Sequence, residues 1–245
     1  MRTVVVTGGT QGIGAAIATR FHRAGDFLII GARRDNGLTA KLGERAQFVA
    51  ADVTQADDHK RLVDAALAAT GRLDVYVNNA GRSQWMPLDK ITGEFWNAML
   101  DVNAKSVLLG AQAAASVLPS GGCILNISSL AGKRGSANNS VYCASKFAVN
   151  GITQALAKEL GPRGIRVNAV CPVLVRTPGL IEALQEEPAP AGGHPDQFLA
   201  AFTQANAALG KLPTAEQVAD FCLALVATEG VTGQCINVDC GVFPQ

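Results

Sequence analysis

Apolar residues in this chain gather in short runs rich in β-branched side chains, and longer amphipathic segments separate those runs. Buried strands of a parallel sheet produce such runs, and the crossover helices between them produce the amphipathic segments. The pattern predicts seven strands, which cover Thr3–Val6, Phe27–Gly31, Gln47–Ala51, Leu73–Val77, Cys123–Ile127, Ile165–Cys171 and Gln234–Val238. It predicts a helix after the first strand and others over Ala56–Thr70, Glu94–Leu118, Ser140–Leu160 and Ala215–Ala227. The fold class that follows is α/β.

Length and charge narrow the class of protein. The 245 residues, 48% of them hydrophobic, are enough for one core, so we expect a single domain over residues 1–245. The net charge is +1, which gives no electrostatic reason to expect binding to nucleic acid or to an anionic membrane. No apolar run reaches the ~18 residues of a membrane span, and the N-terminus does not resemble a signal peptide.

The six cysteines form no CxxC pair and do not cluster with the three histidines. A zinc site needs such spacing, so no metal site is expected. Cysteines without a disulfide pattern fit reduced thiols, and the expected location is the cytoplasm.

A glycine-rich turn follows the first predicted strand and reads TGGTQGIG over residues 7–14. The N–H groups at the start of the next helix would point at an anion, and the missing side chains would let a pyrophosphate approach the backbone. Glycines at 8, 12 and 14 depart from the GxGxxG spacing, so an ordinary tight turn is the alternative. The position between a strand and a helix favours nucleotide binding.

The end of the second strand bears on which nucleotide binds. An acidic residue there would bind the ribose 2′-hydroxyl of NAD, whereas an arginine can pair with the 2′-phosphate of NADP. Ala32 stands at the acidic position and Arg33 follows it. NADP(H) is therefore favoured over NAD(H), with solvated arginines as the alternative. Asp52, at the end of the third strand, would contact adenine or cap the next helix.

Candidate chemistry lies between Ser129 and Lys146. Tyr142 and Lys146 share one face of the predicted helix because they are four residues apart. The lysine charge is expected to lower the pKa of the phenol, which would suit a general acid or base. Ser129 follows the fifth strand, at the sheet edge where open parallel sheets bind ligands. A tyrosine and a lysine at this spacing also occur by chance on exposed helix faces.

Two further features carry open alternatives. Asn103 falls inside a predicted helix, where asparagine competes for backbone hydrogen bonds, and it would be either exposed or placed at a kink that holds water. Residues 178–212 form the candidate lid, and its Pro/Gly/Ala-rich part, Glu186–Pro195, predicts a mobile loop. A solvated surface loop is the alternative, and His194 is expected to be exposed.

Eight short motifs together resemble the short-chain dehydrogenase/reductase superfamily. They are TGGTQGIG at 7–14, DV at 52–53, NNAG at 78–81, VN at 102–103, ISS at 127–129, YCASK at 142–146, RVNAVCP at 166–172 and TGQCINVD at 232–239. Each is weak alone, but their order and spacing are specific and span nearly the whole chain. The resemblance implies a single-domain Rossmann-type fold, a doubly wound parallel sheet of about seven strands with helices on both faces. It also implies a nicotinamide cofactor and reversible carbonyl–alcohol interconversion.

The resemblance assigns catalytic roles to four residues. Tyr142 would protonate the carbonyl oxygen in reduction and deprotonate the hydroxyl in oxidation. Lys146 would acidify the phenol and bind the nicotinamide ribose. Ser129, rather than Ser128, would orient the substrate oxygen, and Asn103 would position a water behind the lysine.

The expected cofactor contacts extend along the chain. They are Gly8, Thr10, Gln11, Gly12, Ile13, Gly14, Arg33, Asp52, Val53, Asn79, Ala80, Gly81, Tyr142, Lys146, Pro172, Val175 and Thr177. Two departures from the family pattern stand out. Val173 replaces the usual glycine after Pro172, which is expected to narrow the pocket, and the second helix has room for only a few residues.

The sequence therefore predicts an NADP(H)-dependent ketoreductase or alcohol dehydrogenase acting on a small or medium carbonyl compound. An NAD-dependent dehydrogenase of a secondary alcohol, sugar or cis-diol is the second reading. A non-catalytic nucleotide-binding regulator ranks last because the Ser–Tyr–Lys–Asn set is intact. By resemblance, a homotetramer or at least a homodimer is expected. Substrate identity and direction stay open.

Overall fold

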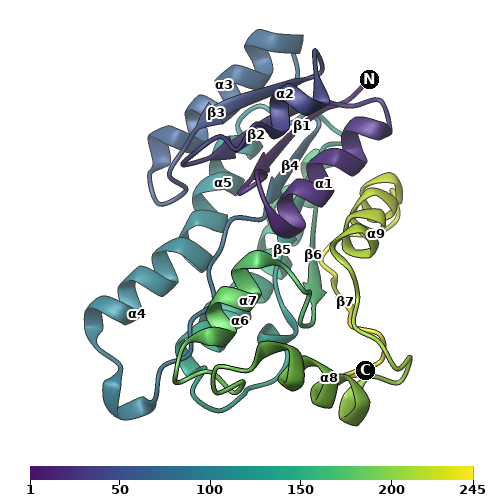
Figure 1. Cartoon of the computed structure of the whole chain (residues 1–245). Helices are drawn as coiled ribbons and strands as arrows, with labels where there is room; N and C mark the ends of the chain where they lie inside the picture. Colours follow the sequence, from purple (N-terminus) through teal and green to yellow (C-terminus); the bar gives the residue numbers. More distant parts are fainter. Residues whose placement is uncertain (245) are drawn as a thin grey trace.

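The computed structural model describes residues 1–244, so Gln245, the last residue of the predicted domain, lies outside the described part. Seven parallel strands form one sheet in the order β3-β2-β1-β4-β5-β6-β7 (Figure 1). Their bounds are β1 Thr3–Thr7, β2 Phe27–Ala32, β3 Ala46–Ala50, β4 Val75–Asn78, β5 Cys123–Ile127, β6 Arg166–Pro172 and β7 Cys235–Val238. The predicted doubly wound Rossmann-type sheet is confirmed.

Alternation along each strand divides the core into two layers. On β1, Val4 and Val6 pack with α1 and α9, whereas Val5 packs with the helices of the opposite face. Successive side chains point to opposite faces, so an uninterrupted apolar strand needs cover on both. One face is covered by α1 Gly12–Arg23 and α9 Ala215–Ala227, the other by α3 Ala56–Thr70, α5 Ser106–Ala115 and α6 Ser140–Leu160.

The strand order reverses between β1 and β4, whose C-terminal ends lie side by side. Open α/β sheets bind ligands at such a switch point. The Thr7 hydroxyl ties the two ends together: it donates to the Val77 carbonyl (3.3 Å) and accepts from the N–H groups of Asn79 (3.0 Å) and Ala80 (3.2 Å). The glycine turn and the NNAG segment therefore meet at one place.

The predicted long helix over Glu94–Leu118 is wrong in one respect, because it consists of three pieces. These are α4 Gly93–Leu100, a π-helical turn over Asp101–Lys105 and α5. Asn103 lies on the π turn and is fully buried, so the alternative of an exposed asparagine is also wrong. Single π turns inside helices commonly occur at functional sites.

Residues 178–212, named the lid below, fold largely as two helices, α7 Pro178–Gln185 and α8 Pro195–Asn206. They form a third apolar cluster with Trp85, and this cluster includes Ala189 and Ala191 of the connecting turn. The alternative of a solvated surface loop is therefore wrong at those two alanines, although His194 is exposed as predicted. Figure 1 shows α8 near the C-terminal end of the chain.

The remaining elements are short. The predicted brevity of the second helix is confirmed, since α2 Leu38–Leu42 has five residues. Single 3-10 turns cover Leu88–Lys90, Leu130–Gly132 and Gly161–Arg163. No helix within residues 1–244 combines the length and the apolar character that crossing a membrane requires.

Candidate active site

Ser129 and Tyr142 come together at the C-terminal end of β5. Ser129 caps the turn that follows the strand, and its oxygen accepts from the Ala131 N–H at 3.1 Å. Tyr142 stands in the first turn of α6, and a hydrogen bond with the Ser129 side chain acts to lower its pKa. The bond from Ala131 uses only an acceptor site of the serine oxygen, so its O–H can still donate toward the phenol or a substrate oxygen.

Lys146 lies one turn further along α6 and is only 5% exposed. Its Nζ donates to the Ile127 carbonyl at 2.9 Å and lies 5.8 Å from the centroid of the Tyr142 ring. The lysine is therefore beside the phenol, as the spacing predicted. This strand-end carbonyl holds the ammonium in place.

The expected lowering of the Tyr142 pKa is wrong. Part of Tyr142 is exposed, yet protein surrounds its phenol closely enough that burial raises its pKa to about 12. Burial also lowers the pKa of Lys146 to about 8. Removing water disfavours the charged form of each group, and for Tyr142 that cost exceeds the opposing effect of the hydrogen bond with Ser129.

Asn103 uses its side chain to hold the segment after β4. Its Nδ2 donates to the Arg82 carbonyl and its Oδ1 accepts from the Arg82 N–H, both at 2.9 Å. A Cβ added to Gly81 would lie 2.9 Å from that Oδ1 and 3.7 Å from Lys146 Nζ. The asparagine is therefore next to the lysine, and Gly81 must lack a side chain for the two to stay close. Sequence reasoning missed the role of Arg82, whose contribution is its backbone.

The glycine turn forms a cradle at the start of α1. Gly8 and Gly12 have φ of +62° and +54°, and a Cβ on Gly14 would lie 2.2 Å from the Gly8 carbonyl oxygen. The capping residue Gln11 makes no side-chain hydrogen bond, and the first helical turn holds no acidic residue. Neighbouring Thr10 accepts on its carbonyl from the Asn36 side chain. This helix end fits a pyrophosphate, because its N–H groups and dipole are available to an anion.

Asn79 supports the cradle from the neighbouring strand end. Its Nδ2 donates to the carbonyls of Thr7 (2.9 Å) and Gly8 (3.2 Å). Sequence reasoning missed Thr7 as the partner of Asn79 and Ala80. A buried threonine that ends a strand beside the switch point is the signal that could have identified it.

Asp52 does not cap the next helix, because Gln55 occupies that position. The Asp52 carboxylate instead accepts from the N–H and hydroxyl of Thr54, at 3.0 and 2.8 Å. These bonds, followed by the positive charge of Arg33, lower the pKa of Asp52. Arg33 is exposed. The structure thus brings the two residues expected at the adenosine end close enough to interact.

At the other end, Thr177 joins the glycine turn. Its side chain caps α7 by accepting from the Leu180 N–H at 3.3 Å, and a Cβ on Gly12 would lie 3.3 Å from its methyl group. Pro172 and Val175, which precede Thr177 in the sequence, are both buried. The Val173 N–H donates to the Val238 carbonyl of β7 at 3.4 Å.

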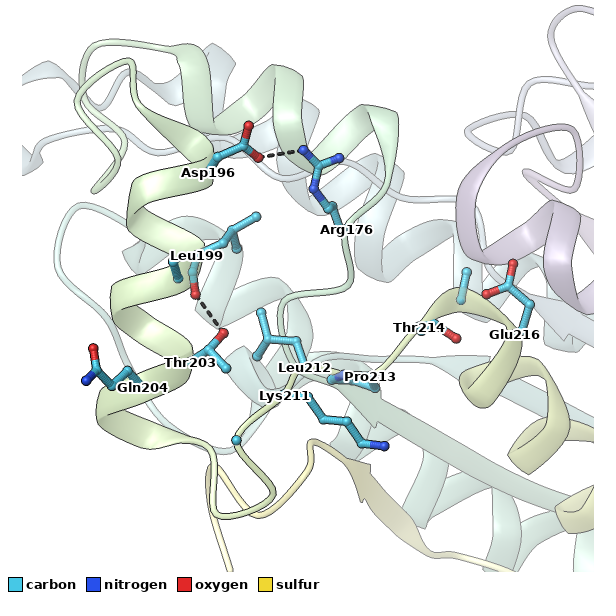
Figure 2. A pocket seen from close by; sticks show the side chains of 13 residues that line it. Arg176, Asp196, Leu199, Thr203, Gln204, Lys211, Leu212, Pro213, Thr214 and Glu216 are labelled. Carbon is cyan, nitrogen blue, oxygen red and sulfur yellow. Dashed lines mark hydrogen bonds and ion pairs between the residues drawn. The ribbon is translucent and has the colours of Figure 1, made fainter.

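A cavity of ≈760 Å³ opens elsewhere, between α8, the following loop and the start of α9 (Figure 2). Its lining includes Arg176, which pairs with Asp196 at 2.5 Å, but none of Ser129, Tyr142 and Lys146. It is therefore separate from the converging polar groups. Residues 1–244 contain no group of three or more His, Cys, Asp or Glu side chains suited to a metal ion.

Comparisons with known proteins agree with this geometry. Residues 8–243 match the family model described as enoyl-(acyl carrier protein) reductase. A diacetyl reductase from Staphylococcus aureus that forms (S)-acetoin is 36% identical, over 98% of this chain and 97% of the relative. A variant of the actinorhodin polyketide ketoreductase, solved with NADPH, is 30% identical with a TM-score of 0.90, over 98% and 97% of the two chains. The ligand-free aldohexose dehydrogenase of Thermoplasma acidophilum is 29% identical with a TM-score of 0.87, over 98% and 93%.

Proposed function

The chain belongs to the short-chain dehydrogenase/reductase superfamily and is an NAD(P)-dependent oxidoreductase of carbonyl and alcohol groups. From this premise we propose that it is an NADP(H)-dependent ketoreductase with Tyr142 as its general acid and base. The observation that carries the proposal is the convergence of Ser129, Tyr142 and Lys146 at the end of β5.

The cofactor would lie along the switch point. The glycine turn over residues 7–14 would hold its pyrophosphate, and Arg33 would pair with a 2′-phosphate beside Asp52 and Val53. Thr177 and Val175 would border its nicotinamide. When bound, the cofactor supplies the hydride that reduces the carbonyl carbon.

The protein's own side chains then transfer one proton and stabilise the negative charge that this transfer leaves on Tyr142. Tyr142 donates its proton to the carbonyl oxygen, and Ser129 holds that oxygen by a hydrogen bond. The Lys146 ammonium stabilises the phenolate that remains. Asn103 acts indirectly, because its hydrogen bonds to the Arg82 backbone keep the segment beside Lys146 in place. In oxidation the same groups run in reverse.

Replacing Tyr142 by phenylalanine tests the proposal. Loss of a general acid typically costs ~10²- to 10⁴-fold in rate, so Y142F should abolish turnover on a panel of small ketones while NADPH affinity stays nearly constant. Ser129→Ala should lose most activity, whereas the matched change Ser128→Ala should retain most of it. Substantial turnover by Y142F would remove Tyr142 from this role.

The second candidate is an NAD-dependent dehydrogenase of a secondary alcohol, sugar or cis-diol. The structural similarity to an aldohexose dehydrogenase favours keeping it. Measuring kcat/KM for NADPH and NADH with ketones, sugars and diols decides between the two. Small diketones belong in the panel because a relative is a diacetyl reductase.

Two further proposals concern the setting of the enzyme. Trp96 on α4, Leu108 on α5 and Phe147 on α6 are 45%, 39% and 49% exposed, and such exposed apolar side chains support an interface in a homotetramer or homodimer. Light scattering on the purified protein tests this. The cysteines are all free thiols, which supports a cytoplasmic location.

A further inference from the structure

A buried polar pair lies beneath the adenosine end of the proposed cofactor site. His59 on α3 is 1% exposed and Tyr76 on β4 is fully buried. His59 Nδ1 lies 2.7 Å from the Tyr76 hydroxyl, and His59 Nε2 lies 2.8 Å from the Val53 carbonyl oxygen. The imidazole therefore connects a central strand to the Asp52–Val53 segment.

The hydrogen-bond directions follow from the chemistry of the three groups. Burial lowers the pKa of His59, so the imidazole is neutral near pH 7, with one donor and one acceptor nitrogen. The Val53 carbonyl can only accept, so Nε2 carries the proton. Nδ1 must then accept, and the Tyr76 hydroxyl donates to it. Burial raises the pKa of Tyr76, which keeps that proton in place.

The surroundings of the pair are apolar. Tyr76 belongs to the cluster that also contains Leu62 and Val63 of α3, and its ring lies close to Gly110, where a Cβ would be 2.9 Å away. An apolar pair of similar volume would fill this space without the cost of burying polar groups. Within residues 1–244, only one hydrogen bond of the pair reaches outside this cluster, and it is the bond that His59 Nε2 donates to the Val53 carbonyl.

The other bonds of the segment are more exposed. The Asp52 N–H donates to the Asp58 carboxylate at 2.7 Å, and Thr54 donates to Asp52. Water competes for such bonds, so they hold a turn less firmly than a buried contact does. His59 supplies a less exposed contact, from a side chain that is itself buried.

We propose that His59 is a positioning residue for the adenosine half of the dinucleotide, because it fixes the Val53 carbonyl and with it the backbone on which adenine rests. This inference depends on the proposed cofactor site. Tyr76 sets the tautomer of His59 and thereby aims the Nε2 proton at Val53. The general role of such a residue is to hold a binding group in its productive geometry.

Two conservative variants separate this role from simple packing. The amide nitrogen of glutamine can occupy the place of Nε2, whereas that of asparagine lies nearer to Nδ1 and cannot reach Val53. His59→Gln should keep the Kd of NADPH within about twofold of wild type. His59→Asn should raise it about five- to tenfold, the effect expected for one lost hydrogen bond.

Isothermal titration calorimetry measures the binding of NADPH and of 2′,5′-ADP, which is the adenosine half of the cofactor alone. Steady-state kinetics measure kcat at saturating cofactor. His59→Asn should weaken both ligands by the same factor and leave kcat nearly unchanged. If His59→Gln weakens binding as much as His59→Asn, or if 2′,5′-ADP binds both variants as it binds wild type, the inference is wrong.

A double variant guards against misfolding. His59→Leu with Tyr76→Phe removes both side-chain partners of the 2.7 Å contact, so the melting temperature should recover relative to His59→Leu alone, because the Tyr76 hydroxyl is no longer buried without an acceptor. NADPH affinity should stay reduced, since Val53 still lacks its donor. If the double variant recovers NADPH affinity as well as melting temperature, His59 and Tyr76 contribute only packing and the inference is wrong. Failure of wild type to bind NADPH, NADH and 2′,5′-ADP would instead overturn the proposed cofactor site itself.

Discussion

The nucleotide cradle and the lid are built by different kinds of contact. In the cradle, backbone approaches backbone: Gly14 sits against the Gly8 carbonyl, and Asn79 donates to the carbonyls at the start of the turn. In the lid, side chains of α7 and α8 pack on Trp85 in a separate small cluster. Backbone contact tolerates no added methyl group, whereas side-chain packing accepts residues of similar volume. The conformation of the cradle is thus constrained by its backbone, whereas the side chains that pack the lid can vary in shape.

A methyl group added to each region tests this contrast most strongly. Gly14→Ala places a Cβ 2.2 Å from the Gly8 carbonyl oxygen, so we expect it to destabilise the protein by about 1–3 kcal/mol and to remove measurable NADPH binding. Gly179→Ala in α7 meets nothing within 4 Å and should change stability by no more than about 1 kcal/mol, in the stabilising direction. Thermal melting and titration measure both. Equal damage from the two changes would contradict the comparison.

Arginine substitutions sharpen the contrast within the cradle. Arg33→Ala should reduce kcat/KM with NADPH by about tenfold or more and leave NADH nearly unaffected, because a charge-assisted bond to the 2′-phosphate is lost. Arg34→Ala is the matched control, since the two residues are adjacent and both exposed. A loss shared equally by both cofactors, or by both variants, would show that Arg33 does not read the 2′-phosphate.

The pH profile tests the catalytic roles proposed for Tyr142 and Lys146. Lys146 has a pKa lowered to about 8, and Tyr142 has one raised to about 12. The phenol therefore keeps its proton across neutral pH, while the lysine loses its charge above about pH 8. We expect kcat/KM for ketone reduction to be level below that value and to fall above it, because a neutral lysine no longer stabilises phenolate. A profile that stays level to pH 10 would show that Lys146 does not act through its charge.

The smallest effect is expected from the ion pair at the lid. Arg176 and Asp196 have side chains 64% and 78% exposed, and exposed pairs contribute about 0–1 kcal/mol. Asp196→Asn should leave the melting temperature and the KM for ketone nearly unchanged, and added salt should not alter wild type and variant differently. A large shift in KM would show that this pair, rather than the apolar cluster, holds the lid in place.

Local sequence signals predicted much of the fold. The bounds of α3, α9 and β5 coincide with the structure, since turn residues interrupt the apolar pattern at their ends. Ser129, Tyr142 and Lys146 were also predicted as a group, because a strand end and the spacing of residues along a helix bring them together. Their catalytic roles stay predictions.

The remaining features depended on tertiary contacts. The π turn at Asn103 accompanies side-chain bonds to Arg82, a residue 21 positions away. The pKa values of Tyr142 and Lys146 moved opposite to simple attraction because the folded chain excludes water from both. His59 and Tyr76 gave no sequence signal, since their contact exists only where α3 crosses β4. By itself the sequence determined which segments form strands and helices, through short-range periodicity. Only the tertiary structure decided which side chains are buried and which residues distant in sequence pair, because water is excluded by neighbours in space rather than by neighbours in sequence.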